Sequence, residues 1–248
     1  ALFDAGDDGS GIRLGESVGG VADRMDRVSA WRFINPPMAW AMGIIVNGRG
    51  ERYCDETVYG AFLGERMCEE QEGRAILIIN RALYRQALKE IMPGKVMIFQ
   101  LMAAASNMFF NARKGKTVED LAGTCGMAPE ILRATIDDYN AAAGGKREDI
   151  FGKPKKYMRG LEEGPYYAMD VSVDSKLFPC PTITFGGLLV DEKTGRVKRA
   201  DGSTIRGLYA AGRTAVGVAS NSYVSGLSIA DCVFYGRRAG RHAASVSG

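Results

Sequence analysis

The chain has 248 residues, of which 46% are hydrophobic and 25% are charged, with a formal net charge of +3. This composition is typical of globular proteins and excludes an intrinsically disordered chain, while the length allows one large domain or two smaller ones. The small net charge, with no basic run interleaved with aromatic residues, argues against nucleic-acid binding.

The first third of the chain predicts alternating helices and strands. A helix is expected after Asp8-Gly9-Ser10-Gly11, where the favoured interpretation is an ordinary N-cap and the alternative is an anion or ribose contact. An apolar strand over 43–46 leads through an Asn-Gly turn into a return strand. A buried strand follows over 75–80, and a helix over 81–91. This alternation predicts an α/β or α+β architecture.

The most apolar window is Val96–Phe110. It is 15 residues long and contains Gln100, Ser106 and Asn107, so it is too short and too polar to span a bilayer. It predicts either a buried core helix or the wall of a lipophilic substrate cleft, because methionine adapts to irregular apolar ligands. The core helix is the favoured interpretation, since most apolar helical stripes are core.

Two further helices are predicted from Thr117 onward. Asp120 stands three residues after Thr117 as in a capping box, and Pro129 starts the second helix, which ends at Gly144. The stretch that follows is charged and contains glycine and proline, which is typical of a linker. We therefore expect a domain boundary near Gly164.

The last part of the chain predicts short strands and a final helix. Tight turns are expected over 192–195 and 200–202, and a buried strand over 208–211 meets Gly212. The final helix is expected to begin near Ser225 or Gly226. Its apolar, close-packing face is formed by Ile229, Val233, Gly236 and Gly240.

Cysteine and histidine usage limits the chemistry. The five cysteines are scattered without a C-x-x-C pair, which argues against a zinc site or a disulfide framework and favours a reducing cytoplasm. His242 is the one histidine, near the end of the last helix, so neither a Ser-His-Asp triad nor a multi-histidine metal site is predicted. Proton transfer would depend on Tyr, Ser, Lys, Arg or carboxylate groups.

Hydroxyl groups crowd the start of the final helix. Its N-terminus carries partial positive charge and free N–H groups, so it would stabilise an anion such as the N1–C2=O edge of a reduced flavin. In extended backbone, the side chains of Tyr223 and Ser225 would point to one side, toward one pocket. The alternative, favoured on spacing alone, is that Ser222 or Ser225 caps the helix and Tyr223 packs.

Three segments carry a resemblance to a known family. "GLYAAGRTAVGVASNSYVSGLSIADCVFYGRRAG", "VNGRGERYCDETVYGAF" and "TVEDLAGTCGMAPEILRATIDDYNA" resemble the FAD-dependent fumarate reductase and 3-ketosteroid dehydrogenase superfamily. The Tyr-x-Ser-Gly arrangement at Tyr223, Ser225 and Gly226 is most similar to the 3-ketosteroid Δ4-(5α)-dehydrogenases. The likeness extends over almost the whole chain.

The resemblance implies roles for three hydroxyl groups. A tyrosine matching Tyr223 hydrogen-bonds the 3-keto oxygen, a serine matching Ser225 takes the C4 proton, and flavin N5 accepts hydride from C5. Because serine alone is a weak base, a tyrosine relays the proton; Tyr59 is our choice and Tyr53 the competitor. Tyr59 stands where the reductases place an arginine, and "CPTITFGG" contains no histidine, so a dicarboxylate substrate is disfavoured.

The resemblance also implies the cofactor and the organisation of the chain. The fold would be the C-terminal part of a Rossmann-like FAD-binding domain, residues 1–28 and 165–248, with an inserted α+β substrate cap, residues 29–164. The sequence contains no G-x-G-x-x-G fingerprint, so an N-terminal half of the FAD-binding domain is expected from the same or another chain. Candidate cofactor contacts are Gly212, Arg213, Gly226, Leu227, Ser228, Asp8 and Gly9.

Three functions therefore stay open. The first is an FAD-dependent dehydrogenase acting on a small lipophilic ketone, with a steroid as the implied substrate. The second is a flavin-dependent enoate or steroid reductase, which runs the same hydride step backward. The third is a non-catalytic fragment or subunit that completes the FAD-binding domain of a partner.

Overall fold

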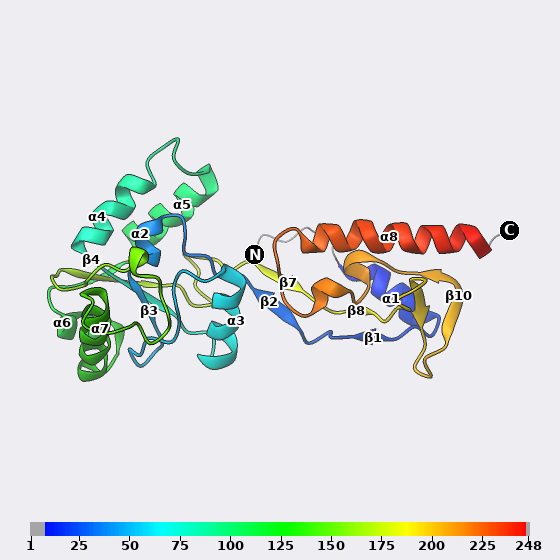
Figure 1. Ribbon diagram of the computed structural model, residues 1–248, viewed down its shortest axis with the longest axis horizontal. Helices are drawn as coiled ribbons and strands as arrows, with labels where there is room; N and C mark the ends of the chain where they lie inside the picture. The colour runs from blue at the N-terminus through cyan, green and yellow to red at the C-terminus, as the bar shows by residue number, and fades with distance from the viewer. Residues whose placement is uncertain (1–7, 247–248) are drawn as a thin grey trace. The chain divides into compact units, whose positions relative to one another are not determined.

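The computed structural model describes residues 8–246, which form two compact units (Figure 1). Unit 1 contains the chain up to Ser29 and again from Pro181 onward, and unit 2 contains Ala30–Cys180. Both units mix helices and strands, which confirms the predicted fold class at that level. No helix among residues 8–246 is long and apolar enough to cross a membrane.

The second boundary between the units lies later than expected. The segment after Gly164 does not leave unit 2, because Tyr166–Asp170 forms strand β6, which pairs with a neighbouring strand on each side. Ala168 and Met169 of this strand are buried in the core. The boundary expected near Gly164 is therefore wrong, and the chain leaves unit 2 between Cys180 and Pro181. The charged, proline-containing segment before β6 is a loop that returns the chain to the sheet, and it was mistaken for a linker between domains.

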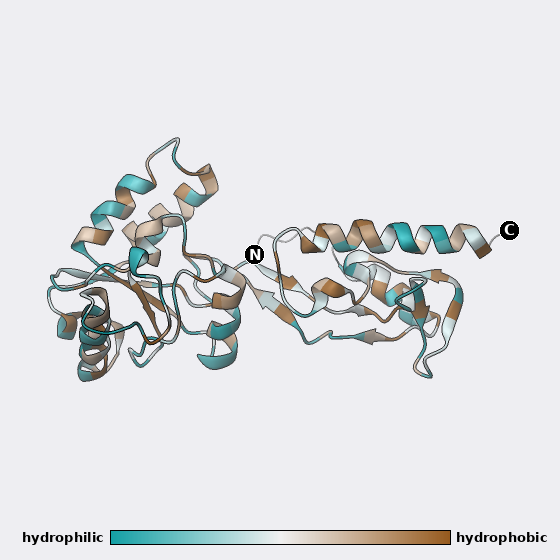
Figure 2. Ribbon diagram, in the orientation of Figure 1, coloured by the Kyte–Doolittle hydropathy of each residue, from teal (hydrophilic) through white to brown (hydrophobic). Residues whose placement is uncertain are grey.

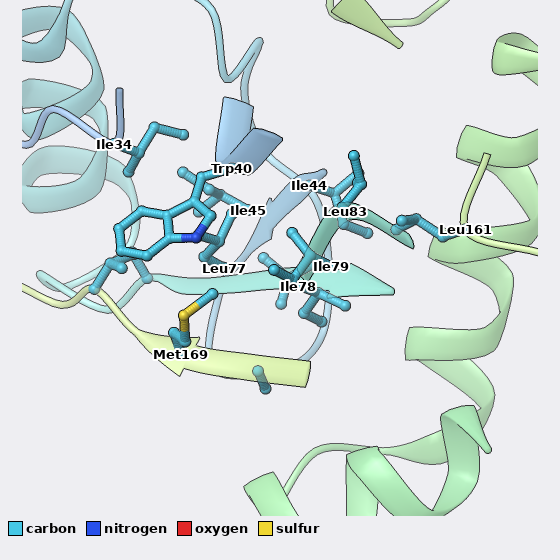
Figure 3. Packing of buried hydrophobic residues seen from close by; sticks show 14 of the residues in the cluster. Ile34, Trp40, Ile44, Ile45, Leu77, Ile78, Ile79, Leu83, Leu161 and Met169 are labelled. Carbon is cyan, nitrogen blue, oxygen red and sulfur yellow. The ribbon is translucent and has the colours of Figure 1, made fainter. Parts of the chain in front are cut away.

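Unit 2 is built on a four-stranded antiparallel sheet in the order β3-β4-β6-β5. The strand β4 is almost continuously apolar and buried, because α2 and α4 contact it and the neighbouring strands pair with it. Figure 3 shows Trp40 beside Leu77 and Ile45 in this core. The strands are β3 (Ile44–Val46), β4 (Ile76–Asn80), β5 (Arg113–Gly115) and β6 (Tyr166–Asp170).

The helices of unit 2 begin and end close to the predicted signals. The capping box of Thr117 and Asp120 is present, and Pro129 stands at the first position of its helix. The return strand expected after the Asn-Gly turn is absent there, because residues 47–51 form a wider turn and one isolated bridge follows. The helices are α2 (Met38–Ala41), α3 (Gly60–Glu70), α4 (Arg81–Glu90), α5 (Ile98–Ser106), a π-helix (Asn107–Asn111), α6 (Val118–Cys125), α7 (Pro129–Ala143) and a 3₁₀ turn (Lys155–Tyr157).

The interpretation of Val96–Phe110 as a core helix holds for one face only, because Ala104 and Met108 are buried in the core of unit 2 and Leu101 and Ala105 pack against it. Only Ala104 of α5 is buried, while Ile98, Met102 and Phe110 have 75%, 67% and 79% of their surface exposed. The cleft-wall interpretation is not tested by this exposure. A helix composed like a core element thus has several large side chains exposed; Figure 2 colours its ribbon by hydropathy.

Unit 1 consists of short two-stranded sheets and two helices. The pairs are β1 with β8, β2 with β7 and β9 with β10. Its small core gathers around Leu188 and Val197. The elements are α1 (Ser10–Ser17), β1 (Ala22–Asp23), β2 (Val28–Ala30), β7 (Thr182–Thr184), β8 (Gly187–Leu188), β9 (Arg196–Lys198), β10 (Thr204–Tyr209), two 3₁₀ turns (Gly212–Thr214 and Val218–Ser220) and α8 (Leu227–Val246).

The final helix, α8, begins within two residues of the predicted start but packs on the opposite face. Ile229 and Val233 are largely exposed, and no atom of residues 8–246 lies within 4 Å of a Cβ built on Gly236 or Gly240. The buried residues of α8 are Asp231 and Ala239. The predicted close-packing face is thus an outer face within unit 1.

Candidate functional site

The loop before α8 is a series of tight turns fixed by side chains of unit 1. The Gly217 amide donates to Ser220 Oγ at 3.0 Å, and Arg24 Nη1 donates to the Ser220 carbonyl at 3.1 Å and to Asn221 Oδ1. Arg24 thus holds the loop from a distant part of the sequence. Sequence reasoning missed it, because no local pattern links an arginine in a turn to a loop almost 200 residues later.

Tyr223 and Ser225 follow this turn with different exposure. Tyr223 is half-buried and Ser225 is exposed. Ser225 lies in a turn with Gly226, whose φ is +86°, and the expectation that both side chains face one pocket stays a prediction. Both hydroxyl-bearing residues nevertheless lie within four positions of the start of α8.

The N-terminus of α8 is open to a ligand. The first internal bond of the helix runs from the Ala230 amide to the Gly226 carbonyl at 3.0 Å, so the amides of Ser228 and Ile229 have no carbonyl partner within the helix. Apart from its chain neighbours, no described residue has an atom within 4 Å of a Cβ built on Gly226. Helix dipole, amides and space therefore suit an anionic, flat group.

A small pocket in unit 1 brings three of the predicted cofactor contacts together. Gly212, Arg213 and Ser228 line it, with Asp231 and Ser220. Gly212 has φ +62°, and a Cβ there would stand 2.6 Å from Cys232 Sγ, so only glycine allows the turn to approach α8 this closely. Arg213 Nη2 donates to Thr184 Oγ1 at 3.2 Å, which directs the guanidinium along the pocket.

Asp231 is a buried acid that the sequence analysis did not select. Its carboxylate lies against Gly217, where a Cβ would be 2.6 Å from Oδ1, and Oδ1 has no hydrogen-bond partner among residues 8–246. Burial raises the pKa of Asp231 above its usual value. An acid within an otherwise apolar helix start could have been noticed, since buried acids need a structural or chemical reason.

Asp8 and Gly9 act as the N-terminal cap of α1. Gly9 has φ +75°, and Asp8 Oδ1 accepts the Ser10 amide at 2.9 Å. Arg13 donates to Asp8 Oδ2 at 3.1 Å. These contacts match the N-cap interpretation that the sequence favoured. A Cβ on Gly11 would stand 2.9 Å from Thr214 Cγ2, so α1 lies beside the turn that carries Arg213.

In unit 2, Tyr59 stands immediately before α3 in an aromatic setting. Its ring centroid is 6.1 Å from that of Trp31 and 6.2 Å from that of Phe62, and its side chain is half-buried. Gly60 and Gly64 permit this packing, because a Cβ on Gly64 would stand 1.7 Å from the Ala30 carbonyl oxygen. The aromatic frame therefore depends on two glycines of α3.

Tyr53, the competitor of Tyr59, lies inside the core. It is 6% exposed, and its hydroxyl has no partner among residues 8–246. Burial raises the pKa of Tyr53 far above its usual value. Tyr53 is therefore less accessible than the half-buried Tyr59.

Four charged side chains form a buried cluster behind Tyr59, which we call the charge cluster: Arg52, Glu56, Asp149 and Lys153. The Glu56 carboxylate accepts from Arg52 Nε at 2.8 Å, Lys153 Nζ at 2.9 Å and the Ile45 amide at 2.9 Å. Arg52 also pairs with Asp149. The cluster therefore anchors the segment that ends at Tyr59 to strand β3 and to the loop after α7.

His242, the one histidine of the sequence, has a structural partner in unit 1. His242 Nδ1 lies 2.9 Å from the Tyr209 hydroxyl on β10. The group is therefore part of the packing between α8 and the β9–β10 hairpin. No group of three or more His, Cys, Asp or Glu side chains among residues 8–246 is arranged to hold a metal ion.

The residues at the start of α8 and in the small pocket of unit 1 have the chemistry that a flavin requires. The open helix N-terminus, the Gly212 turn that admits no Cβ, and the Arg213 side chain suit an anionic cofactor edge. The unpaired Asp231 oxygen is the kind of acceptor that a bound donor satisfies. Tyr59 belongs to unit 2, whereas Tyr223, Ser225 and the predicted cofactor contacts belong to unit 1.

Comparison with known proteins identifies relatives with the predicted chemistry. The chain is 46% identical over 208 residues to a 3-oxo-5-alpha-steroid 4-dehydrogenase of Comamonas testosteroni, which covers 84% of this chain and 39% of the relative. It is 28% identical over 229 residues to a fumarate reductase of Schizosaccharomyces pombe, which covers 92% of this chain and 40% of that protein. The chain thus spans about two fifths of these curated relatives.

A solved structure shares the fold. The 3-ketosteroid-delta4-(5alpha)-dehydrogenase of Rhodococcus jostii RHA1, in complex with 4-androstene-3,17-dione, is 30% identical with a TM-score of 0.80. The match covers 96% of this chain and 45% of that protein. In addition, the family described as the FAD binding domain matches residues 14–229, and its description names the cofactor that the sequence predicted. The chain therefore belongs to the FAD binding domain family.

Proposed function

We propose that this chain is part of an FAD-dependent oxidoreductase that introduces the C4–C5 double bond of a 3-ketosteroid. The observation that carries the proposal is the 46% identity with the steroid 4-dehydrogenase of Comamonas testosteroni over 84% of the chain. The Tyr-x-Ser-Gly arrangement directly before the open N-terminus of α8 supports it. In this proposal, unit 1 is the FAD-binding part and unit 2 the substrate cap.

The proposed reaction breaks two C–H bonds of the substrate: C4 loses a proton and C5 loses a hydride. The Tyr223 hydroxyl donates to the 3-keto oxygen, which acidifies C4 and stabilises the enolate charge of the transition state. The Ser225 oxygen accepts the C4 proton, and the electron pair of that C–H bond forms the C4=C5 double bond. FAD, when bound, accepts the hydride that leaves C5.

Tyr59 is proposed to relay the proton from Ser225. Its phenol is accessible, and Trp31 and Phe62 fix its ring. The buried Tyr53 hydroxyl has no route for a proton among the described residues. The apolar ring surfaces around Tyr59 also suit a neutral lipophilic substrate better than a dicarboxylate.

The test is a set of hydroxyl deletions in the polypeptide that contains this chain and binds FAD. Tyr223→Phe and Ser225→Ala are expected to lower kcat for a 5α-3-ketosteroid by at least about 100-fold with the flavin absorbance retained. Turnover is followed with an artificial electron acceptor. Tyr235→Phe, on the exposed α8, is the matched control. Unchanged turnover of Tyr223→Phe would remove this residue from the mechanism.

Tyr59 and Tyr53 are separated by the same assay. We expect Tyr59→Phe to lower kcat and to shift the pH dependence of kcat, because a relay group titrates during turnover. Tyr53→Phe removes a hydroxyl without a partner and is expected to leave kcat unchanged. A loss of activity in Tyr53→Phe alone would exchange the two roles.

A second candidate is a subunit that completes the FAD-binding domain of another polypeptide. The chain spans about two fifths of the length of these curated relatives, and the cofactor contacts proposed in unit 1 would be shared with the polypeptide that supplies the rest of the domain. Titration of the 248-residue chain with FAD distinguishes the two. Full-strength binding by the chain alone would exclude the need for a partner, whereas weak binding that a partner polypeptide restores would support it.

A further inference from the structure

The α4–α5 hairpin of unit 2 carries an exposed apolar stripe. Ile98 and Met102 are one turn apart on α5, so they share a face. The π-helix that continues α5 adds Phe109 and Phe110, which are 63% and 79% exposed. Exposed large apolar side chains grouped in this way mark interaction sites, because isolated ones are the rule on monomer surfaces. The other exposed members are Met92, Met97 and Phe99.

The same part of the chain holds a marked excess of positive charge. Residues 73–118 contain eight basic residues and one acidic residue, whereas the rest of the chain contains 24 basic and 28 acidic residues. The acid, Glu90, is bonded to the Ala39 amide and to Gln86. The small net charge of the whole protein therefore conceals a cationic segment that coincides with the apolar stripe. The eight basic residues, all exposed, are Arg74, Arg81, Arg85, Lys89, Lys95, Arg113, Lys114 and Lys116.

The cationic side chains are regularly placed on α4. Arg81, Arg85 and Lys89 follow one another at four-residue spacing, so they form one exposed ridge. Lys95 lies in the connection between α4 and α5 and donates to the Lys89 carbonyl at 3.0 Å. Figure 1 shows this connection at the tip of the hairpin, away from the sheet of unit 2. The ridge thus ends at the connection that leads into the apolar stripe.

We propose that the α4–α5 hairpin is a docking surface for an anionic phospholipid bilayer. Phenylalanine, isoleucine and methionine side chains can enter the boundary between headgroups and acyl chains, while lysine and arginine attract anionic headgroups. An acidic protein partner would also be attracted by the basic residues. Such a partner, however, would not need so many exposed aliphatic and aromatic side chains with no acidic residue between them. The proposal concerns binding at the surface and does not depend on the proposed reaction.

The association has a chemical use if the proposed substrate is correct. Lipophilic ketones partition into bilayers, so an enzyme that docks there meets its substrate at a higher local concentration. The docking surface itself is independent of this use, because it follows from exposure and charge.

The test is co-sedimentation of the 248-residue chain with vesicles. Neutral phosphatidylcholine vesicles are compared with vesicles that contain about 30% phosphatidylglycerol, at low and high salt. We expect binding to the anionic vesicles, with weakening at high salt. Each basic residue near such a surface contributes about fivefold in affinity, so Arg85→Glu with Lys89→Glu is expected to weaken binding at least about tenfold.

A second double variant tests the apolar stripe. Ile98→Ser with Phe110→Ser is expected to weaken binding at least about tenfold, since both side chains would leave water on docking. Matched controls are Ile150→Ser, at a position 66% exposed, and Lys146→Glu, at an exposed position outside the segment. Both controls are expected to bind as the parent chain does. Far-UV circular dichroism verifies that every variant is folded.

Three results would overturn the proposal. The first is equal sedimentation with neutral and anionic vesicles, or none with either. The second is a dimer in light scattering that Ile98→Ser with Phe110→Ser dissociates, because a second copy would then cover the stripe. The third is binding of a single-stranded oligonucleotide that competes with the vesicles and is lost in Arg85→Glu with Lys89→Glu.

Discussion

Replacement of the buried acid of the charge cluster tests how the segment before Tyr59 is held. Glu56 has a fully buried side chain and accepts hydrogen bonds from Arg52, Lys153 and the Ile45 amide. Glu56→Gln keeps the volume but removes the charge. The one buried acid left, Asp149, pairs with Arg52, so the Lys153 ammonium keeps no acidic partner and is bonded to the Gly43 carbonyl at 2.6 Å.

The expected cost follows from the burial of the partners. Removal of one member of a buried ion pair typically costs about 3–5 kcal/mol, because the other charge stays buried and uncompensated. Burial lowers the pKa of Lys153 even beside Glu56, so its ammonium is already costly to keep charged. We therefore expect Glu56→Gln to lower the free energy of unfolding by about 3 kcal/mol, and Lys153→Met by a similar amount.

The double variant shows whether these costs share one cause. Glu56→Gln with Lys153→Met removes one charge of each sign, so we expect about 3–4 kcal/mol in total and a coupling energy of about 2–3 kcal/mol. Urea titration followed by tryptophan fluorescence reports on unit 2, because both tryptophans, Trp31 and Trp40, lie there.

A control and a refuting result accompany this cycle. Glu119 and Arg133 form an equally short but exposed pair at 2.7 Å, so Glu119→Gln is expected to cost less than about 1 kcal/mol. Additive costs in the double variant, or a cost of Glu56→Gln no larger than that of Glu119→Gln, would refute the argument that the cluster acts as a unit.

Three further predictions concern unit 2 and use the same fluorescence assay. Gly64→Ala should destabilise unit 2 by about 3 kcal/mol or more, since the new Cβ would stand 1.7 Å from the Ala30 oxygen. Gly123→Ala, with open space around it, should stabilise unit 2 slightly. Equal effects of the two substitutions would contradict the close packing at Gly64. Burial raises the pKa of Asp149, but hydrogen bonds from Arg52 and backbone amides outweigh burial, so the pKa lies below its usual value. Its contribution is therefore present above about pH 4 and lost as the pH falls, so Asp149→Asn should flatten the acid loss of stability; an unchanged slope would exclude this group. Asn80→Ala removes the cap that accepts the Leu83 amide at 3.1 Å and should cost about 1 kcal/mol, and no loss would show that the cap is dispensable.

The sequence predicted helices and strands well where residues close to one another in the sequence supply the stabilising contacts. The Thr117–Asp120 capping box and Pro129 act within one turn of their helices, so they are readable from neighbouring residues. The strand over 75–80 was found because β4 is apolar throughout. By contrast, β6 is held by pairing with β4 and β5, and no local pattern distinguishes such a strand from the start of a new domain.

The outward faces of α5 and α8 were mispredicted for a related reason. Periodicity shows that a helix has an apolar face, but not whether anything in the chain covers it. At the candidate site, the sequence placed Tyr223 and Ser225 directly before the final helix, where the structure has them, while their roles stay a prediction. The contact that Arg24 makes with the loop before α8 is tertiary and was not visible in the sequence, whereas Asp231 could have been noticed as an acid in an apolar helix start.

The two glycines of α3 have a consequence for redesign. Because Gly60 and Gly64 bring the helix against the segment that carries Trp31, the helix and this segment form one rigid carrier for Tyr59. Libraries intended to broaden the range of accepted molecules should leave both glycines fixed. Diversity belongs at Trp31 and Phe62, which frame the phenol and whose replacement reshapes its surroundings while sparing the scaffold.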